Sequence, residues 1–118
     1  MKNIVCLIML IGILVSCGDN TYEQDIIGKW EVADWRIVDS DEKINRKMDF
    51  SFQTDKTYDV DYGGKTEKGT FWFRGDKLYT HEEGKADKKV RILTLTPDTL
   101  KMEMNRAGTI EEVILIRP

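Results

Sequence analysis

Few residues in this 118-residue chain have the types and spacing that catalysis or metal binding would need. His81 is the only histidine. One imidazole beside Glu82 and Glu83 does not make a metal site without a second cluster of ligands. Asp59 and Asp61 form a possible carboxylate pair, but they alternate with apolar residues, which places them on the solvated face of a strand. We find no glycine-rich phosphate loop, nucleophile elbow or metal-ligand spacing. The sequence therefore predicts no catalytic residue, no metal and no cofactor, and a protein that is not an enzyme.

Cys17 is the residue with the clearest chemistry. It follows Leu14-Val15-Ser16 and closes a segment that starts with Lys2 and continues as an apolar run over residues 4–15. This run is too short for a membrane span, which needs about 20 residues. It has the length of the hydrophobic part of a signal peptide, which is either that of a lipoprotein or an ordinary secretory signal. Residues 14–17 resemble the lipobox of bacterial lipoproteins.

The lipobox resemblance implies an anchored protein in three parts. Residues 1–16 would be the signal peptide, residues 17–25 the lipidated cysteine and a polar tether, and residues 26–118 the exported domain. The membrane would then be a partner through the acylated Cys17, in the bacterial cell envelope. Gly18 stands where an aspartate would resemble an inner-membrane retention signal, so the outer membrane is favoured, either facing the periplasm or exposed on the surface.

Charge and length limit the possible partners. The chain has a formal net charge of −3 and is long enough for a single domain after the signal segment. Nucleic-acid binding would call for a basic stripe, so nucleic acid is not an expected partner. Lys85, Lys88, Lys89 and Arg91 form a loose basic cluster, but acidic neighbours offset it, and we interpret it as a solvated face.

Short segments of alternating apolar and polar residues predict an all-β domain. In the first segment the apolar phase slips by one residue after Val32, which predicts a β-bulge near Ala33-Asp34. Short turns separate the segments, the longest loop is 39–47, and no helix is long enough for a crossover. We therefore expect an eight-stranded antiparallel meander closed into a barrel. The expected strands are 26–32, 48–52, 58–62, 69–73, 78–81, 90–95, 100–104 and 110–116.

Several short motifs resemble the lipocalins and the small lipocalin-like lipoproteins of Bacteroidetes. Gly28-x-Trp30 opens the first strand, Gly69-Thr70-Phe71 resembles the opening of a middle strand, and residues 75–78 and 95–100 are similar to two of the family's turns. The resemblance implies that Trp30 packs at the closed end of the barrel under an arginine near the end of the last strand, here Arg117. The chain is shorter than a typical lipocalin and has no room for its C-terminal helix.

Two functional hypotheses follow, because a barrel of eight strands is either filled by side chains or holds one small ligand. In the first, the interior binds a small hydrophobic or amphipathic molecule. In the second, the barrel is filled and its outer face or the loop 39–47 docks an envelope protein or a glycan, with Trp35 and Trp72 on the surface. The candidate interior residues are Trp30, Phe50, Phe52, Tyr58, Tyr62, Phe71, Phe73, Met102 and Met104.

Overall fold

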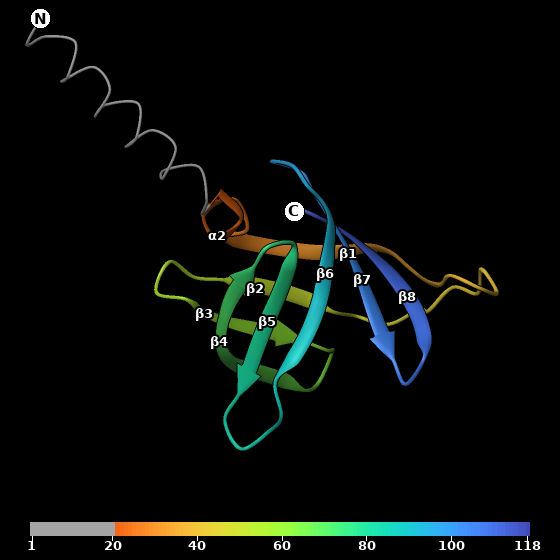
Figure 1. Ribbon diagram of the computed structural model, residues 1–118. Helices are drawn as coiled ribbons and strands as arrows, with labels where there is room; N and C mark the ends of the chain where they lie inside the picture. The colour runs from red at the N-terminus through yellow and green to blue at the C-terminus, as the bar shows by residue number, and fades with distance from the viewer. Residues whose placement is uncertain (1–20) are drawn as a thin grey trace, which may run out of the picture.

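Eight antiparallel strands form a closed barrel in the computed structural model, which describes residues 21–118 (Figure 1). Each strand pairs with the next along the chain, and β1 also pairs with β8, which closes the barrel. The expected all-β meander is confirmed, whereas the signal segment, the lipobox and Cys17 lie outside the described residues. The elements are α2 (Thr21–Asp25), β1 (Gly28–Ile37), β2 (Asp49–Phe52), β3 (Thr57–Asp61), β4 (Thr66–Arg74), β5 (Lys77–Glu82), β6 (Lys88–Leu95), β7 (Thr99–Arg106) and β8 (Thr109–Ile116).

Two strands begin more than one residue earlier than the apolar pattern predicts. β4 begins at Thr66 rather than at residue 69, and its first residues pair with β3, for example Lys68 with Asp59. β6 begins at Lys88 rather than at residue 90. Charged residues at these strand starts interrupt the apolar alternation, so the sequence pattern ends before the hydrogen-bonded ladder does.

The β-bulge in β1 is confirmed, and it corrects the position of Trp35. The register between β1 and β8 shifts between Val32 and Asp34. The bulge inserts one extra residue into β1 and so returns Trp35 to the inner face of the barrel, where its side chain is 3% exposed. The expectation that Trp35 lies on the surface was wrong, because the bulge moves the residues after it onto the opposite face.

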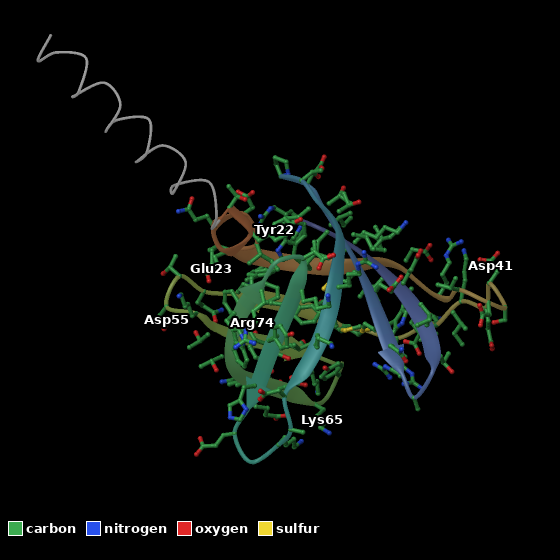
Figure 2. The ribbon with its side chains drawn as sticks, viewed as in Figure 1. Tyr22, Glu23, Asp41, Asp55, Lys65 and Arg74 are labelled. Carbon is green, nitrogen blue, oxygen red and sulfur yellow. The ribbon has the colours of Figure 1, made fainter. Side chains whose placement is uncertain are left out.

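The strand directions define two different ends of the barrel. β1 starts and β8 finishes at the end that carries α2 and the turns 53–56, 75–76 and 96–98, which we call the closed end. The loop 38–48 and the turns 62–65, 83–87 and 107–108 lie at the other end, which we call the open end. Figure 2 shows Tyr22, Glu23 and Asp55 grouped at the closed end and Lys65 at the opposite end.

The closed end is plugged by the predicted pair of Trp30 and Arg117. The guanidinium carbon of Arg117 lies 4.0 Å from the centre of the Trp30 ring. Arg117 also donates hydrogen bonds to the carbonyl oxygens of Asp25 (2.7 Å), Ile27 (2.8 Å) and Pro97 (2.7 Å). The arginine therefore ties the segment after α2 to the turn before β7, and the expectation for this pair is confirmed.

Gly28 is required beside this plug. Its φ is +122°, in a region that residues with a side chain rarely adopt, and a Cβ at this position would clash with Nη1 of Arg117. The glycine therefore allows the backbone to pass directly under the arginine.

The buried core of the described chain is built from residues between Ile26 and Leu115, so residues 21–118 hold both the closed barrel and this core. No helix within residues 21–118 is long and apolar enough to cross a bilayer. The most deeply buried side chains include Ile26, Trp30, Phe52, Leu100, Met102, Val113 and Leu115.

Candidate ligand-binding cavity

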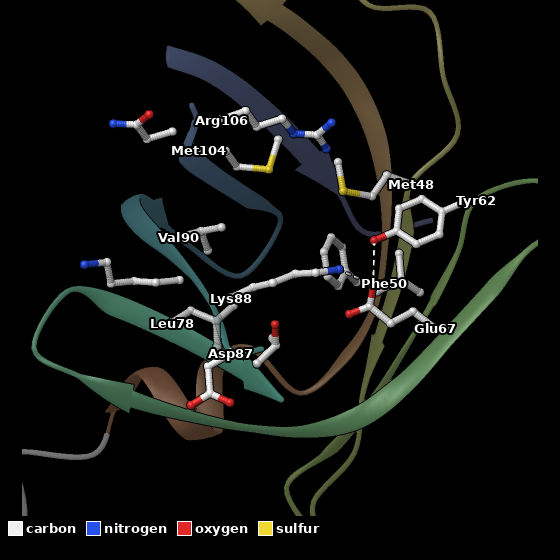
Figure 3. A pocket seen from close by; sticks show the side chains of 14 residues that line it. Met48, Phe50, Tyr62, Glu67, Leu78, Asp87, Lys88, Val90, Met104 and Arg106 are labelled. Atoms are coloured by element: carbon white, nitrogen blue, oxygen red, sulfur yellow. Dashed lines mark hydrogen bonds and ion pairs between the residues drawn. The ribbon is translucent and has the colours of Figure 1, made fainter. Parts of the chain in front are cut away.

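A cavity of about 650 Å³ occupies the open half of the barrel (Figure 3). Strands β2 to β7 contribute to its wall, and Met48, which directly precedes β2, completes it. The apolar part of the wall follows from the period-two alternation, which turns every second side chain inward. This part consists of Met48, Phe50, Val60, Leu78, Val90 and Met104.

A buried carboxylate, Glu67, lies in the wall of this cavity and is 5% exposed. It accepts hydrogen bonds from the hydroxyl groups of Tyr58 and Tyr62 (3.0 Å for Tyr62) and from Nζ of Lys88 (2.7 Å). Lys88 belongs to β6 and Glu67 to β4, so the lysine reaches past β5 to make this ion pair (Figure 3). The cluster joins three separate strands at the mouth of the cavity.

The ionisation states of this cluster follow from its contacts. Burial opposes the charge on Glu67, but the hydrogen bonds from Lys88 and Tyr58 and the charge of Lys88 outweigh it and hold the pKa of Glu67 below its ordinary value of 4.5. Burial and the neighbouring carboxylate raise the pKa of both Tyr58 and Tyr62. At neutral pH the glutamate is therefore ionised and both tyrosines remain hydrogen-bond donors.

A second buried carboxylate, Glu111, lies near the same end of the barrel and is 6% exposed. It accepts a hydrogen bond of 2.8 Å from Nε1 of Trp35, and Nε of Arg106 lies 3.6 Å from the same oxygen. The guanidinium of Arg106 also lies 5.5 Å from the centre of the Trp35 ring. Glu111 and Trp35 thus hold the arginine at the edge of the cavity that Arg106 lines.

The sequence-predicted interior residues divide between the cavity and the core. Phe50, Tyr62 and Met104 line the cavity. Tyr58 contributes its hydroxyl group to the Glu67 cluster. Phe73 is half-buried and packs against Tyr22 of α2, with ring centres 5.6 Å apart. The remaining candidates are buried in the core and do not line the cavity: Trp30, Phe52, Phe71 and Met102.

Sequence reasoning missed the charged residues of the cavity, although strand parity held the signal. Glu67 precedes Gly69 and Phe71 by two and four positions, and Arg106 follows Met104 by two, so both have the parity of inward-facing residues. Lys88 likewise precedes Val90 by two. Lys88 is exposed, as the interpretation as a solvated face expects, but the interpretation missed that β6 starts at this residue and that its ammonium group turns toward Glu67.

The other polar candidates remain ordinary surface groups. Nδ1 of His81 lies 2.7 Å from a carboxylate oxygen of Asp87. Asp61 pairs with Lys47 at 3.3 Å. Among residues 21–118, no group of three or more histidine, cysteine, aspartate or glutamate side chains is arranged to hold a metal ion.

The two interior hypotheses each describe one half of the barrel. Large side chains fill the closed half, and the open half keeps a cavity. A meander barrel that is plugged at one end by a tryptophan–arginine pair and hollow at the other has the architecture of the lipocalin-like barrels.

Comparison with known sequences shows the family. The lipocalin-like domain family matches residues 26–102, and the chain belongs to this family. No curated protein sequence matches the chain.

Solved structures support the same fold. The chain is similar to a lipocalin-like protein from Bacteroides uniformis ATCC 8492, with a TM-score of 0.62 and 16% sequence identity over 80% of this chain and 99% of the other. It is also similar to an uncharacterized protein from Bacteroides eggerthii DSM 20697, with a TM-score of 0.61 and 11% identity over 78% of this chain and 98% of the other. At these identities the likeness concerns the fold alone.

Proposed function

We propose that this protein is a lipid-anchored lipoprotein of the cell envelope that binds one small hydrophobic or amphipathic molecule in the open half of its barrel. The cavity carries this proposal. Its volume of about 650 Å³ lies within the range of about 300–1,000 Å³ that is typical of ligand sites. Its wall combines six apolar side chains with eight polar or charged residues, a mixture that suits an amphipathic molecule. On the sequence grounds given above, we propose a binding protein and not an enzyme.

The proposed anchor is Cys17, which precedes α2 by four positions. Stable anchoring takes two or more acyl chains, which a lipidated cysteine would supply. Because α2 lies at the closed end, the mouth of the cavity would point away from the anchoring membrane (Figure 1). The outer membrane is the proposed location, facing either the periplasm or the exterior.

The docking hypothesis has less support than the binding hypothesis. Trp35 is buried, so it offers no surface for a partner. Trp72 is half-buried and stacks on Tyr79 on the outer face of the barrel, with ring centres 5.6 Å apart. An envelope protein or a glycan as partner would have to use Trp72 and the loop 39–47. Neither feature accounts for the cavity, and we therefore favour ligand binding.

Native mass spectrometry of residues 21–118 tests the proposal, because this fragment contains the complete barrel and its core. The fragment is purified from the bacterial cell envelope under non-denaturing conditions, so that a bound ligand stays in place. We expect a discrete non-covalent adduct that disappears on denaturation. Val90→Trp places a large side chain in the cavity and should remove the adduct, while Arg91→Trp places the same side chain on the outer face and should keep it. An adduct that survives in Val90→Trp would contradict binding in this cavity.

A further inference from the structure

Five charged residues line the cavity near the open end of the barrel: Glu67, Asp87, Lys88, Lys89 and Arg106. Leu78 and Val90 face each other in register on β5 and β6, whereas Lys88 pairs with Thr80, which is two residues nearer the open end. Arg106 is the last residue of β7 and lies at the open end as well. The inner part of the cavity is thus apolar, and the outer part carries ammonium and guanidinium groups. A ligand that fits both parts has an apolar tail and a polar head group.

Hydrogen-bond accounting shows which kind of head group the mouth complements. The carboxylate of Glu67 already accepts three hydrogen bonds, and that of Glu111 is used by Trp35 and Arg106. Lys88 has three N–H donors and uses one of them for Glu67, and Arg106 has five. In the described part of the chain, Arg106 is held by an ion pair and a ring contact but donates no hydrogen bond within 3.5 Å. Asp87 also lines the cavity, and its carboxylate lies 2.7 Å from Nδ1 of His81. The mouth therefore has donors to spare on its cations, while each of these carboxylates already has a partner.

The groove that adjoins the mouth is basic. It has a volume of about 400 Å³ and shares Tyr62, Glu67, Lys88 and Arg106 with the cavity. Its acidic lining residues are Glu67 and Glu82 only, although the whole chain has a net charge of −3. A concentration of one sign of charge around a concave site attracts ligands of the opposite sign. The basic lining residues are Arg46, Lys47, Lys65, Lys85, Lys88 and Arg106.

A cationic head group fits this mouth poorly. To reach the carboxylate of Glu67 it would have to displace the ammonium group of Lys88 from a 2.7 Å contact. Its charge would then lie among the six basic side chains of the groove, where like charges repel. An anionic head group can instead accept hydrogen bonds from Lys88 and Arg106 while both internal carboxylates keep their partners.

We propose that the ligand is a single-chain amphiphile with an anionic oxygen head group, bound with its tail among Leu78, Val90 and Met104 and its head group at Lys88 and Arg106. This inference rests on the proposed function and narrows it to one ligand class. The head group is a carboxylate or a phosphate, since both present several acceptor oxygens to charged donors.

Isothermal titration calorimetry with four probes that share one tail tests the head-group preference. Dodecanoate, dodecyl phosphate, dodecanol and dodecylammonium are titrated into residues 21–118 below their aggregation concentrations. We expect at least one of the two anions to bind about tenfold or more tightly than the alcohol, because hydrogen bonds to charged groups are about twice as strong as neutral ones. We expect the ammonium to bind most weakly. The anion that binds more tightly, dodecanoate or dodecyl phosphate, identifies the head group as a carboxylate or a phosphate.

Variants at the mouth test whether Lys88 binds the anionic head group. Lys88→Met should reduce anion affinity about tenfold and reduce dodecanol affinity much less, because only the anion loses a partner of opposite charge. Lys68→Met is the matched control, because Lys68 lies on the exposed outer face of β4, and it should leave the affinity for every probe unchanged. Since Lys88→Met alone leaves the buried Glu67 without its ion pair, the double variant Lys88→Met/Glu67→Gln provides a second test with no unpaired carboxylate. Circular dichroism verifies the fold of each variant.

The outcomes separate the two proposals. Equal or tighter binding of dodecanol or dodecylammonium would overturn the anionic head group and leave ligand binding intact. Loss of anion preference in Lys68→Met as strong as in Lys88→Met would overturn the assignment to the mouth. If none of the four probes binds, both this inference and the proposed binding of amphipathic molecules are overturned.

Discussion

Replacing Arg117 by methionine tests how the closed end is held together. The substitution removes three hydrogen bonds of 2.7–2.8 Å to backbone carbonyls and the contact of 4.0 Å with the Trp30 ring. A hydrogen bond from a charged donor contributes about 1.5–3 kcal/mol, and two of the three are exposed, so their share lies at the lower end of this range. The cation–π contact adds about 0.5–2 kcal/mol. At the lower end of these ranges the contributions amount to about 5 kcal/mol, so we expect the free energy of unfolding to fall by about 5 kcal/mol. This is a large part of the stability of about 5–15 kcal/mol that small domains have.

Urea unfolding of residues 21–118, followed by tryptophan fluorescence and circular dichroism, measures this loss. Arg91→Met is the matched control. Arg91 is an exposed arginine whose ion pair with Asp76, at 3.0 Å, lies on the surface, so its removal should cost about 1 kcal/mol or less. If Arg117→Met costs no more than Arg91→Met, the closed end is not held by this arginine, and the reasoning is refuted.

Three further predictions concern the glycine at the plug, the buried carboxylate and the orientation of the barrel. Gly28→Ala should lower the free energy of unfolding by about 1–3 kcal/mol more than Gly64→Ala, because both have a positive φ but only a Cβ at position 28 meets a neighbour; equal losses would contradict this contact. The lowered pKa of Glu67 adds stability that is complete above its ordinary value of 4.5 and is lost as the pH falls through the folded value. Glu67→Gln should therefore lose less stability than the wild type between about pH 5 and pH 3 in urea titrations, and parallel curves would argue against an ionised Glu67. In lipidated protein on vesicles, a fluorophore at Thr54→Cys should be quenched by bilayer-bound quenchers more than one at Ala107→Cys, and the reverse order would place the mouth at the membrane.

The closed half of the barrel could be predicted from the sequence because its residues follow simple rules. Alternating apolar residues predicted the strands, the slipped phase predicted the bulge, and Gly28-x-Trp30 with Arg117 predicted the plug. Each of these signals is local or rests on one short motif. The position of Trp35 was wrong because a bulge changes the face of every residue that follows it, and the phase alone does not show how many residues the bulge takes up.

The open half was harder to predict because its inward positions are charged. An apolar pattern marks a strand only where the buried face is apolar, so Glu67 and Lys88 were assigned to turns or to solvent. Their pairing also joins β4 and β6, which are not neighbours in the sheet, and no local pattern encodes such a contact. Likewise, the choice between a filled and a hollow interior depends on side-chain volumes across the whole barrel rather than on any one strand.

Binding of one apolar molecule in the open half is the central claim, and titration with the neutral fluorophore N-phenyl-naphthylamine tests it without assuming a head group. We predict a saturable rise in fluorescence with one site per chain for residues 21–118 and for Arg91→Trp, and its loss in Val90→Trp, whose ring occupies the cavity. No saturable signal in the wild type, or an unchanged signal in Val90→Trp, would contradict a ligand site at this position.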